Sequence, residues 1–356
     1  MRTLITSEQV TEGHPDKICD RISDAVLDEI LGSDPDARVA VETMAAKNTV
    51  FVAGEVTTDA SFDADGIVRK ILRETGYVSP EIGISADECA VMRQIVRQSP
   101  DIALGVDRDG AGDQGMMFGY ATNETESLMP LSWRLATDLC SAMAEKRKSG
   151  EFPFLRPDGK AQVTVEYCDG KPVRIDSVVA SAQHSPDVSV EEVREALRSL
   201  IPFEIDSGTK LYLNPTGRFV EGGPMADVGL TGRKIICDSY GGIARVGGGA
   251  FSGKDPTKVD RSGAYMARKI ACDAVRGGFA ERCEIELCYA IGVAEPVAVF
   301  ADSFGTGDDE AIVRMISERY DLTPKGIIRF LDLKRPIYGK TSAYGHFGKK
   351  GLPWED

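Results

Sequence analysis

Residues 247–268 hold the charged side chains whose spacing most directly suggests chemistry. Four glycines at the start of this segment, at 247–249 and 253, let the backbone approach a ligand closely. Lys254 and Lys258 add two cations where a helix is predicted to begin, and a helix N-terminus itself favours anions. Asp255 and Asp260 would repel a bare anion but suit one that arrives with Mg²⁺. We therefore predict a polyphosphate–metal site; the alternative is a loop that only caps a buried helix.

The same segment matches most of a phosphate-binding P-loop, but two features argue against one. Gly248 to Lys254 spells G-x-x-x-x-G-K, yet Asp255 follows in place of the Ser or Thr that binds Mg²⁺. The preceding strand-like run ends at Cys237, so no strand feeds the loop directly. We instead predict that Asp255 caps a helix whose first turn contains Pro256.

A second charged helix start lies near the N-terminus, in the segment Gly13-His-Pro-Asp-Lys17. An apolar stripe predicts that this helix continues until Gly32 stops it. Asp16 could hold Mg²⁺ or complement the helix dipole. His14 could belong to the same site or only cap the helix, and Lys17 could be an ordinary solvated lysine.

Further candidates lie in turns and strands of the N-terminal half. The glycine-spaced turn that carries Asp113 enters a strand predicted to be buried, and the segment 98–110 before it lacks periodicity. That segment is predicted to be a mobile loop, either an active-site lid or a plain surface loop. Glu42 and Glu55 lie within strand-like runs, where a carboxylate must face solvent, be paired, or bind a cation or a ligand amine.

A glycine-dense stretch from 210 to 249 carries residues suited to a nucleotide. It has an aromatic residue beside a cation to stack on a base, two cations for phosphates, and an acid for a ribose or an amine. These residues are Phe219 with Arg218, Arg233 with Lys234, and Asp227. No Ser-His-Asp or Cys-His arrangement is recognisable, which suits chemistry in which the substrates react directly and the protein stabilises a leaving polyphosphate.

Three predicted β-hairpins of similar spacing must position these residues. Each follows a helix with a proline near its start and precedes an amphipathic helix. The hairpins are 38–57, 161–180 and 284–301, the prolines are Pro15, Pro130 and Pro256, and the later helices are 66–75, 190–201 and 310–320. We predict an α+β fold of three similar domains related by a pseudo-threefold, with chance likeness as the alternative. The expected ranges are 1–101, 102–224 and 225–356, although helices exchanged between units would make them discontinuous.

Composition narrows the class of protein. The 356 residues, 42% of them hydrophobic, suffice for two or three globular domains. A net charge of −14 argues against binding nucleic acid or an anionic membrane as a whole. Eight cysteines without a C-x-x-C pair, no signal-like N-terminus and no long apolar run predict a cytoplasmic protein with reduced thiols.

The chain resembles the S-adenosylmethionine synthetase family over nearly its whole length. Segments 13–17, 110–115 and 247–255 carry the resemblance, supported by 229–234 and the tail 344–355. The resemblance implies that methionine sulphur attacks C5′ of ATP, and that the bound triphosphate is then hydrolysed to pyrophosphate and phosphate. It also implies two Mg²⁺ ions per site, a K⁺ ion, and a homodimer or homotetramer whose sites are shared between subunits.

The resemblance also implies roles for individual residues. Catalytic roles would fall to His14, Asp113, Arg233 and Lys254. ATP would be contacted by His14, Asp158, Lys160, Arg218, Phe219, Asp227, Arg233, Lys234, Ala250 and Lys254. Methionine would be contacted by Glu55, Gln98, Asp227 and Lys258, with Asp113 nearby, while Asp16 and Asp260 would bind Mg²⁺ and Glu42 would bind K⁺.

The chain departs from the family pattern in two places. The stretch from Arg108 to Gly112 is shorter than in many members, and Gly263 stands where alanine is common, at a cost of up to ~1 kcal/mol in helix propensity. Two other functions stay open at this point. A kinase or ligase would release ADP or AMP, and a silent ATP-sensing subunit would be expected to lack some of the charged residues that are present here.

Overall fold

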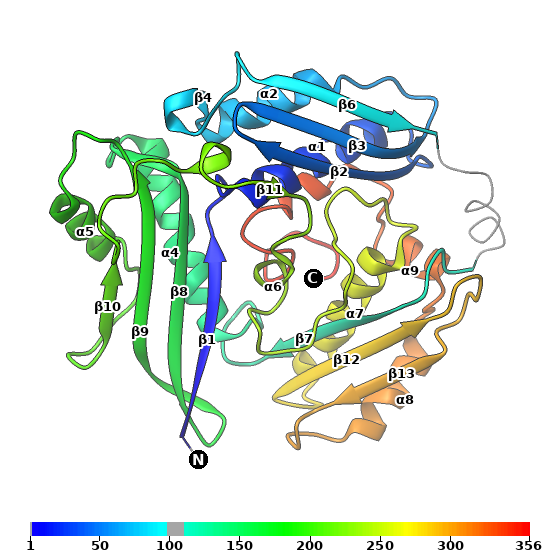
Figure 1. Ribbon diagram of the computed structural model, residues 1–356. Helices are drawn as coiled ribbons and strands as arrows, with labels where there is room; N and C mark the ends of the chain where they lie inside the picture. The colour runs from blue at the N-terminus through cyan, green and yellow to red at the C-terminus, as the bar shows by residue number, and fades with distance from the viewer. Residues whose placement is uncertain (1, 98–109) are drawn as a thin grey trace.

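The computed structural model describes residues 2–97 and 110–356, and these form three large sheets with helices packed on them, together with one small two-stranded sheet (Figure 1). The strands are β1 (Arg2–Val10), β2 (Arg38–Ala46), β3 (Thr49–Thr57), β4 (Val78–Ser79), β5 (Ile84–Ser85), β6 (Ala90–Val96), β7 (Gly115–Thr122), β8 (Leu155–Cys168), β9 (Lys171–His184), β10 (Lys210–Leu213), β11 (Gly229–Leu230), β12 (Arg282–Tyr289) and β13 (Ala298–Asp302).

The helices alternate with these strands along the chain. They are α1 (Pro15–Ser33), α2 (Ala64–Thr75), α4 (Leu131–Ser149), α5 (Val190–Ser199), α6 (Ile235–Asp238), α7 (Val259–Arg276), α8 (Asp309–Arg319) and α9 (Pro324–Phe330), with the 3₁₀ turns η1 (Pro80–Ile82), η2 (Gly223–Met225) and η3 (Tyr338–Lys340). Within the described part of the chain, no helix is long and apolar enough to cross a bilayer.

The three predicted hairpins are confirmed and share one topology. Each is an antiparallel pair: β2 with β3, β8 with β9, and β12 with β13. In each sheet the first hairpin strand also pairs antiparallel with one further strand, so the orders are β11-β2-β3-β6, β1-β8-β9-β10 and β7-β12-β13. The α+β architecture of three similar units is therefore present (Figure 1).

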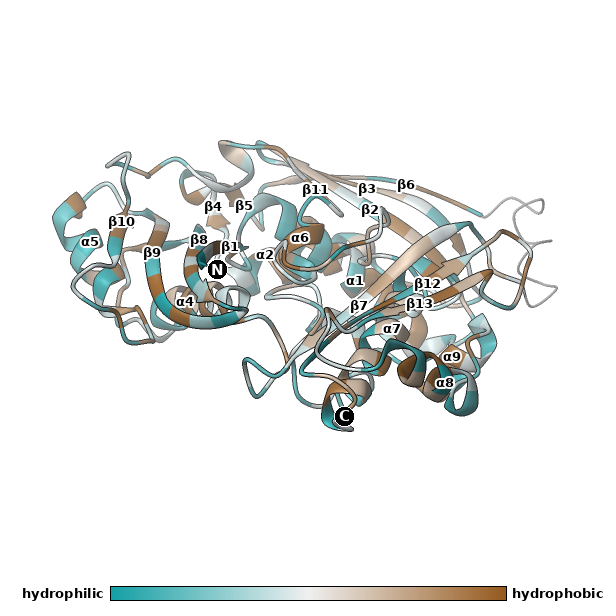
Figure 2. Ribbon diagram, turned by 90° about the horizontal axis from the view of Figure 1, so that it is seen from below, coloured by the Kyte–Doolittle hydropathy of each residue, from teal (hydrophilic) through white to brown (hydrophobic). Residues whose placement is uncertain are grey.

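One long helix covers one side of each sheet. α1 packs against β2, α4 against β8, and α7 against β7 and β12. Figure 2 shows α1, α4 and α7 on the same side of the strands. The buried residues form two apolar cores: one joins the α1 and α7 units, and the other lies between α4, β8, β9 and α5.

The strands that complete the sheets come from distant parts of the sequence. β1 pairs with β8, β7 with β12, and β11 with β2. The units in space therefore do not follow the chain in order, and the expected ranges 1–101, 102–224 and 225–356 stay a prediction about sequence only.

Two helix boundaries differ from the prediction. α1 continues through Gly32 to Ser33, since a glycine in the last turn lowers helix propensity without preventing the helix. α7 begins at Val259 rather than beside Pro256, because the preceding residues are bonded to the edge of β2. All eight cysteines are unpaired, and Cys168 and Cys288 are the two that are not buried.

Candidate active site

His14 is the N-cap residue of α1, as one reading of the sequence allowed. Its Nδ1 accepts a hydrogen bond of 3.2 Å from the N–H of Asp16, and its ring is buried. Burial, with Lys234 and Lys160 nearby, lowers the pKa of His14 to about 3. The imidazole is therefore neutral at physiological pH and lies among cations.

Asp16 joins the start of α1 to the loop that precedes α6. Its Oδ1 accepts a hydrogen bond of 3.0 Å from the N–H of Leu230, and its Oδ2 accepts one from the ammonium group of Lys234. Arg233 Nε lies 3.8 Å from Asp16 Oδ1. Burial opposes ionisation of Asp16, but the hydrogen bonds from Lys234 and Leu230 lower its pKa below the ordinary value. An ionised acid and two cations thus meet beside His14.

Lys17 is not a solvated surface residue, contrary to the alternative considered for it. Its side chain is fully buried, and its ammonium group donates to Asp20 at 2.8 Å and to Asp238. Burial favours the neutral amine, but the two carboxylates raise the pKa of Lys17 above its ordinary value. Lys17 is therefore a buried cation that ties α1 to the last residue of α6.

Lys254 and Asp260 form a second charged cluster at the start of α7. Lys254 Nζ lies 2.7 Å from Asp260 Oδ2, and both side chains are about one-quarter exposed. A methyl group at Gly249 would lie 2.3 Å from Asp260 Cγ, so only glycine lets the loop approach this acid. At the other cluster, Ala250 contacts Gly232. The glycine-rich loop therefore connects the two clusters.

Asp255 does not cap α7, so that prediction was wrong. The cap residue is Lys258, without a side-chain cap bond. Asp255 is fully buried, accepts hydrogen bonds from the N–H groups of Val39 (2.6 Å) and Thr257 (2.8 Å), and pairs with Lys258. Its carboxylate therefore connects the turn before α7 to β2.

Asp158 on β8 has one carboxylate oxygen without a partner. Its Oδ2 accepts a hydrogen bond of 2.9 Å from the N–H of Gly223, whereas its buried Oδ1 accepts none from any residue that the structure describes. Burial raises the pKa of Asp158 to about 6, although the N–H of Gly223 and the charge of Lys160 act against this. Such an unsatisfied oxygen marks a place where an incoming donor would be favourable.

Comparison with known proteins identifies the family of the chain that carries these clusters. Models of the S-adenosylmethionine synthetase N-terminal, central and C-terminal domains match residues 2–100, 108–219 and 221–356. The chain is also 53% identical, over 379 aligned positions, to S-adenosylmethionine synthase of Clostridium tetani (strain Massachusetts / E88), covering 100% of this chain and 97% of that protein.

The chain belongs to the S-adenosylmethionine synthetase family. It is therefore a methionine adenosyltransferase, and the resemblance inferred from the motifs is confirmed.

Two of the candidate site residues lie on an exposed sheet face and not in the charged clusters. Glu42 on β2 and Glu55 on β3 are exposed, and both lie on the face of the sheet away from α1. Cross-strand neighbours Met44, Phe51 and Met92 lie on that same face, and Met44 and Met92 are 41% and 56% exposed. Within one chain these carboxylates do not join His14.

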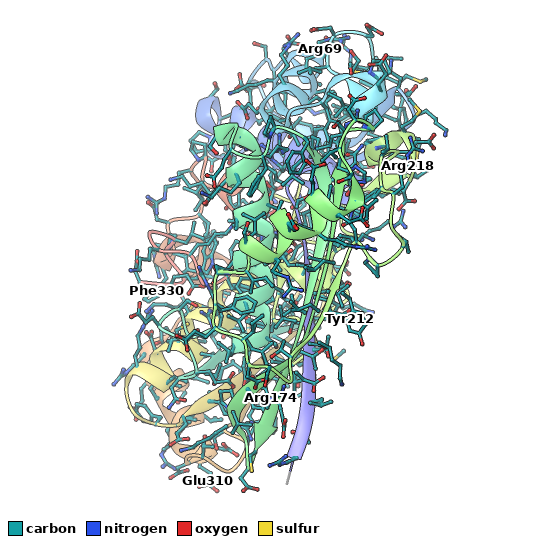
Figure 3. The ribbon with its side chains drawn as sticks, turned by 90° about the vertical axis from the view of Figure 1, so that its left-hand side faces the viewer. Arg69, Arg174, Tyr212, Arg218, Glu310 and Phe330 are labelled. Atoms are coloured by element: carbon teal, nitrogen blue, oxygen red, sulfur yellow. The ribbon has the colours of Figure 1, made fainter. Side chains whose placement is uncertain are left out.

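Three further candidate site residues are exposed at the surface of the chain. Asp113 is exposed just before β7, and Asp227 is exposed but close enough to Asp158 to raise its pKa. Arg218 is exposed on the loop after β10, where Figure 3 shows it at the surface. Gln98, like most of the predicted lid, lies outside the described residues.

Two residues that hold the site in place, His184 and Tyr77, were not predicted from the sequence. His184 exchanges two hydrogen bonds with the backbone of Phe219: its own N–H donates to the Phe219 carbonyl (2.9 Å), and its Nε2 accepts from the Phe219 N–H (3.0 Å). Tyr77 donates to the carbonyl of Gly13 at 2.6 Å. No local pattern reveals either contact, since each partner is distant in sequence.

Proposed function

We propose that this chain transfers the adenosyl group of ATP to methionine at a site built from the two charged clusters, with further groups supplied by a second copy. The observation that carries the proposal is the gathering of His14, Asp16, Lys160, Arg233 and Lys234 at the start of α1. A thioether is a neutral nucleophile that needs no general base, so the demand on the protein is to stabilise the leaving triphosphate.

The cations would supply that stabilisation. Arg233, Lys234 and Lys254 carry positive charge on segments whose backbones are held by hydrogen bonds, so little rearrangement is needed as negative charge develops on the bridging oxygen. His14, neutral and buried, would donate a hydrogen bond near the bond that breaks; its Nδ1 is already an acceptor, so Nε2 carries the proton. Lys160 would contribute charge from β8.

Mg²⁺ fits the acids of both clusters. Asp16 and Asp260 are hard oxygen donors, and each is now paired with a lysine that the triphosphate would attract away. No three His, Cys, Asp or Glu side chains gather as a ligand set among residues 2–97 and 110–356, which suits an ion that also takes phosphate oxygens. When bound, Mg²⁺ would neutralise phosphate charge. Glu42 would hold K⁺.

The two substrates would lie next to each other in this site, with methionine sulphur facing C5′ of ATP. Asp158, with its unsatisfied Oδ1, would accept from the nucleoside, while Phe219 beside Arg218 would stack on adenine and Ala250 would contact ATP. Asp227 would touch both substrates. Glu55, Gln98 and Lys258 would hold the methionine amine and carboxylate, with Asp113 close by.

A second copy of the chain would complete the site. The exposed face that carries Glu42 and Glu55 also carries Met44 and Met92, and an apolar face of this kind is typical of an interface between subunits. Packing two such faces together would bring the carboxylates of one chain toward the cations of the other. We propose a homodimer, or a tetramer of two dimers, acting in the cytoplasm without nucleic-acid or membrane partners.

Product analysis tests the proposal directly. The purified protein is incubated with ATP, methionine, Mg²⁺ and K⁺, and the products are separated by mass spectrometry. The proposal requires S-adenosylmethionine with equal amounts of pyrophosphate and phosphate. ADP or AMP would instead indicate a kinase or a ligase, and ATP binding without turnover would indicate a silent subunit. Either result would overturn the proposal.

A further inference from the structure

Every fourth residue of α1 from 16 to 28 is an aspartate, and each accepts a backbone N–H from a residue between positions 230 and 339. The bonds are Leu230 N–H to Asp16 (3.0 Å), Gly232 N–H to Asp20 (2.8 Å), Gly253 N–H to Asp24 (2.8 Å), and the N–H groups of Tyr338 and Gly339 to Asp28 (2.9 and 2.7 Å). A spacing of four residues places these carboxylates along one stripe of the helix. We call these four residues the aspartate ladder.

The two middle members of the ladder hold the segments that carry the proposed triphosphate cations. Asp20 accepts from Gly232, the residue before Arg233 and two before Lys234, and it also pairs with Lys17. Lys17 in turn pairs with Asp238 at the end of α6. The short segment 232–238 is therefore fixed to α1 at both of its ends, with Arg233 and Lys234 between them.

Asp24 closes the second cationic segment in the same way. Its Oδ1 accepts from the N–H of Gly253 and from Arg261 Nη1 (2.7 Å), and its Oδ2 accepts from Arg261 Nη2 (2.9 Å). Arg261 Nη1 also donates to the carbonyl of Lys254 at 3.1 Å. One buried carboxylate thus ties the residue before Lys254 to the residue after Asp260, so the loop between them has a fixed shape.

We propose that Asp20 and Asp24 are positioning residues, which set the cationic segments 232–238 and 253–261 at a fixed spacing along α1 so that both meet one triphosphate. The residues touch no substrate themselves. The inference rests on the proposed function, because it assumes that Arg233, Lys234 and Lys254 bind the triphosphate. A rigid helix is suited to this task, since a misplacement of about 1 Å in a positioning group lowers rates by up to about 100-fold.

Asp28 provides a matched control. It occupies the same stripe and makes the same kind of bond, but it holds η3, which carries none of the proposed site residues. The test compares full-length Asp20→Ala, Asp20→Asn and Asp28→Ala. For each, kcat and the KM values for ATP and methionine are measured along with the thermal unfolding temperature.

The proposal expects Asp20→Ala to lose about tenfold or more in kcat/KM for ATP, with the KM for methionine less affected. Asp20→Asn keeps an oxygen that can accept from Gly232, so it should stay within about threefold of wild type. Asp28→Ala should lower the unfolding temperature and leave kcat/KM within about twofold. Equal effects of Asp20→Ala and Asp28→Ala on kcat/KM would overturn the proposal.

Two further variants separate this inference from the proposed function. If Arg233→Ala and Lys254→Ala retain full activity, the proposed function fails; if they lose activity while Asp20→Ala does not, only the positioning role fails. Should Asp20→Ala not fold, Asp20→Ser replaces it, because a serine side chain is too short to reach Gly232. Equal activity of the Asn and Ser variants would then overturn the inference.

Discussion

Lys254 Nζ lies 2.7 Å from Asp260 Oδ2, so a cation proposed for the triphosphate is paired with an acid proposed for Mg²⁺. The other cluster has the same relationship, since Lys234 donates to Asp16. Each pair is neutral as a whole before substrate arrives. Binding of ATP with Mg²⁺ would exchange each lysine–aspartate contact for lysine–phosphate and aspartate–metal contacts. Each charged side chain would therefore keep a partner of opposite charge.

Asp260→Asn is therefore expected to weaken metal binding. Loss of one carboxylate should raise the Mg²⁺ concentration for half-maximal activity about tenfold. The measurement is a Mg²⁺ titration of initial rate at fixed total ATP and methionine. Asp273→Asn is the control, because Asp273 also pairs with a lysine of α7, Lys269, at 2.7 Å. A similar shift in both variants would show that the effect is one of general charge.

His14→Asn should separate catalysis from binding. Asparagine is a good N-cap, so α1 keeps its start, but the neutral imidazole beside Lys234 is lost. S-Adenosylmethionine formation should fall about 100-fold while the Kd for ATP changes by less than about threefold. Single-turnover rates and equilibrium ATP binding measure the two quantities. Equal losses in both would refute a role for His14 at the reacting bond.

Oligomerisation should depend on the exposed face of β2, β3 and β6. Met92→Lys places a charge on the proposed interface, so the dimer should dissociate and activity should fall with it. Light scattering across a concentration series gives the mass. Phe330→Lys on α9 is the control, since Phe330 is 52% exposed but lies away from this sheet (Figure 3). An unchanged mass for Met92→Lys would exclude this face.

Two glycines at the contact of β7 with α7 should respond oppositely to alanine. A methyl group at Gly119 would lie 2.0 Å from the backbone of Ala267, which cannot yield, so Gly119→Ala should cost more than ~2 kcal/mol. At Gly263 the nearest atom is Met117 Cγ at 3.1 Å, and a flexible methionine can move. Gly263→Ala should therefore stabilise by up to ~1 kcal/mol. Urea unfolding distinguishes them; destabilisation by both would mean that Met117 is held rigidly.

Stability should fall below pH 6.5 because of His346. Burial, with Arg261, Lys17 and Lys349 near the ring, lowers its pKa well below 6.5, although Asp238 is 3.9 Å away. The folded chain keeps His346 neutral while the unfolded chain takes up a proton, so acid favours unfolding by about 1.4 kcal/mol per pH unit from this group. His346→Asn can still accept from Tyr265 and should lose this increment. Identical pH profiles for the two proteins would contradict it.

The sequence predicted the local parts of this fold better than the contacts between them. The hairpin predicted over 38–57 and the amphipathic helix predicted over 190–201 follow from nearby residues, and both are present. The pairing of β1 with β8 depends on residues 150 or more positions apart, which no local pattern encodes. The prediction that Asp255 caps a helix was wrong for the same reason, because its partner Val39 lies on β2, far away in the sequence.

Candidate site residues divide in the same way. Motif spacing predicted that His14 and Asp16 would share a helix start, yet it left open whether Lys17 is a solvated lysine, because its partner Asp238 is remote in sequence. The aspartate ladder is a four-residue period in the sequence, but nothing local distinguishes buried aspartates from the polar face of an amphipathic helix. Whether such a charged side chain is solvated or buried depends on how segments distant in the sequence pack against it.

The exchange of strands between units has a consequence for how the chain folds during synthesis. β11 completes the first sheet only when residue 230 has emerged, and β7 waits for β12 at residues 282–289. Pairings of such long range close large loops and form slowly. The nascent N-terminal half therefore leaves the ribosome with open sheet edges, and chaperone dependence during translation would be a property of the topology itself.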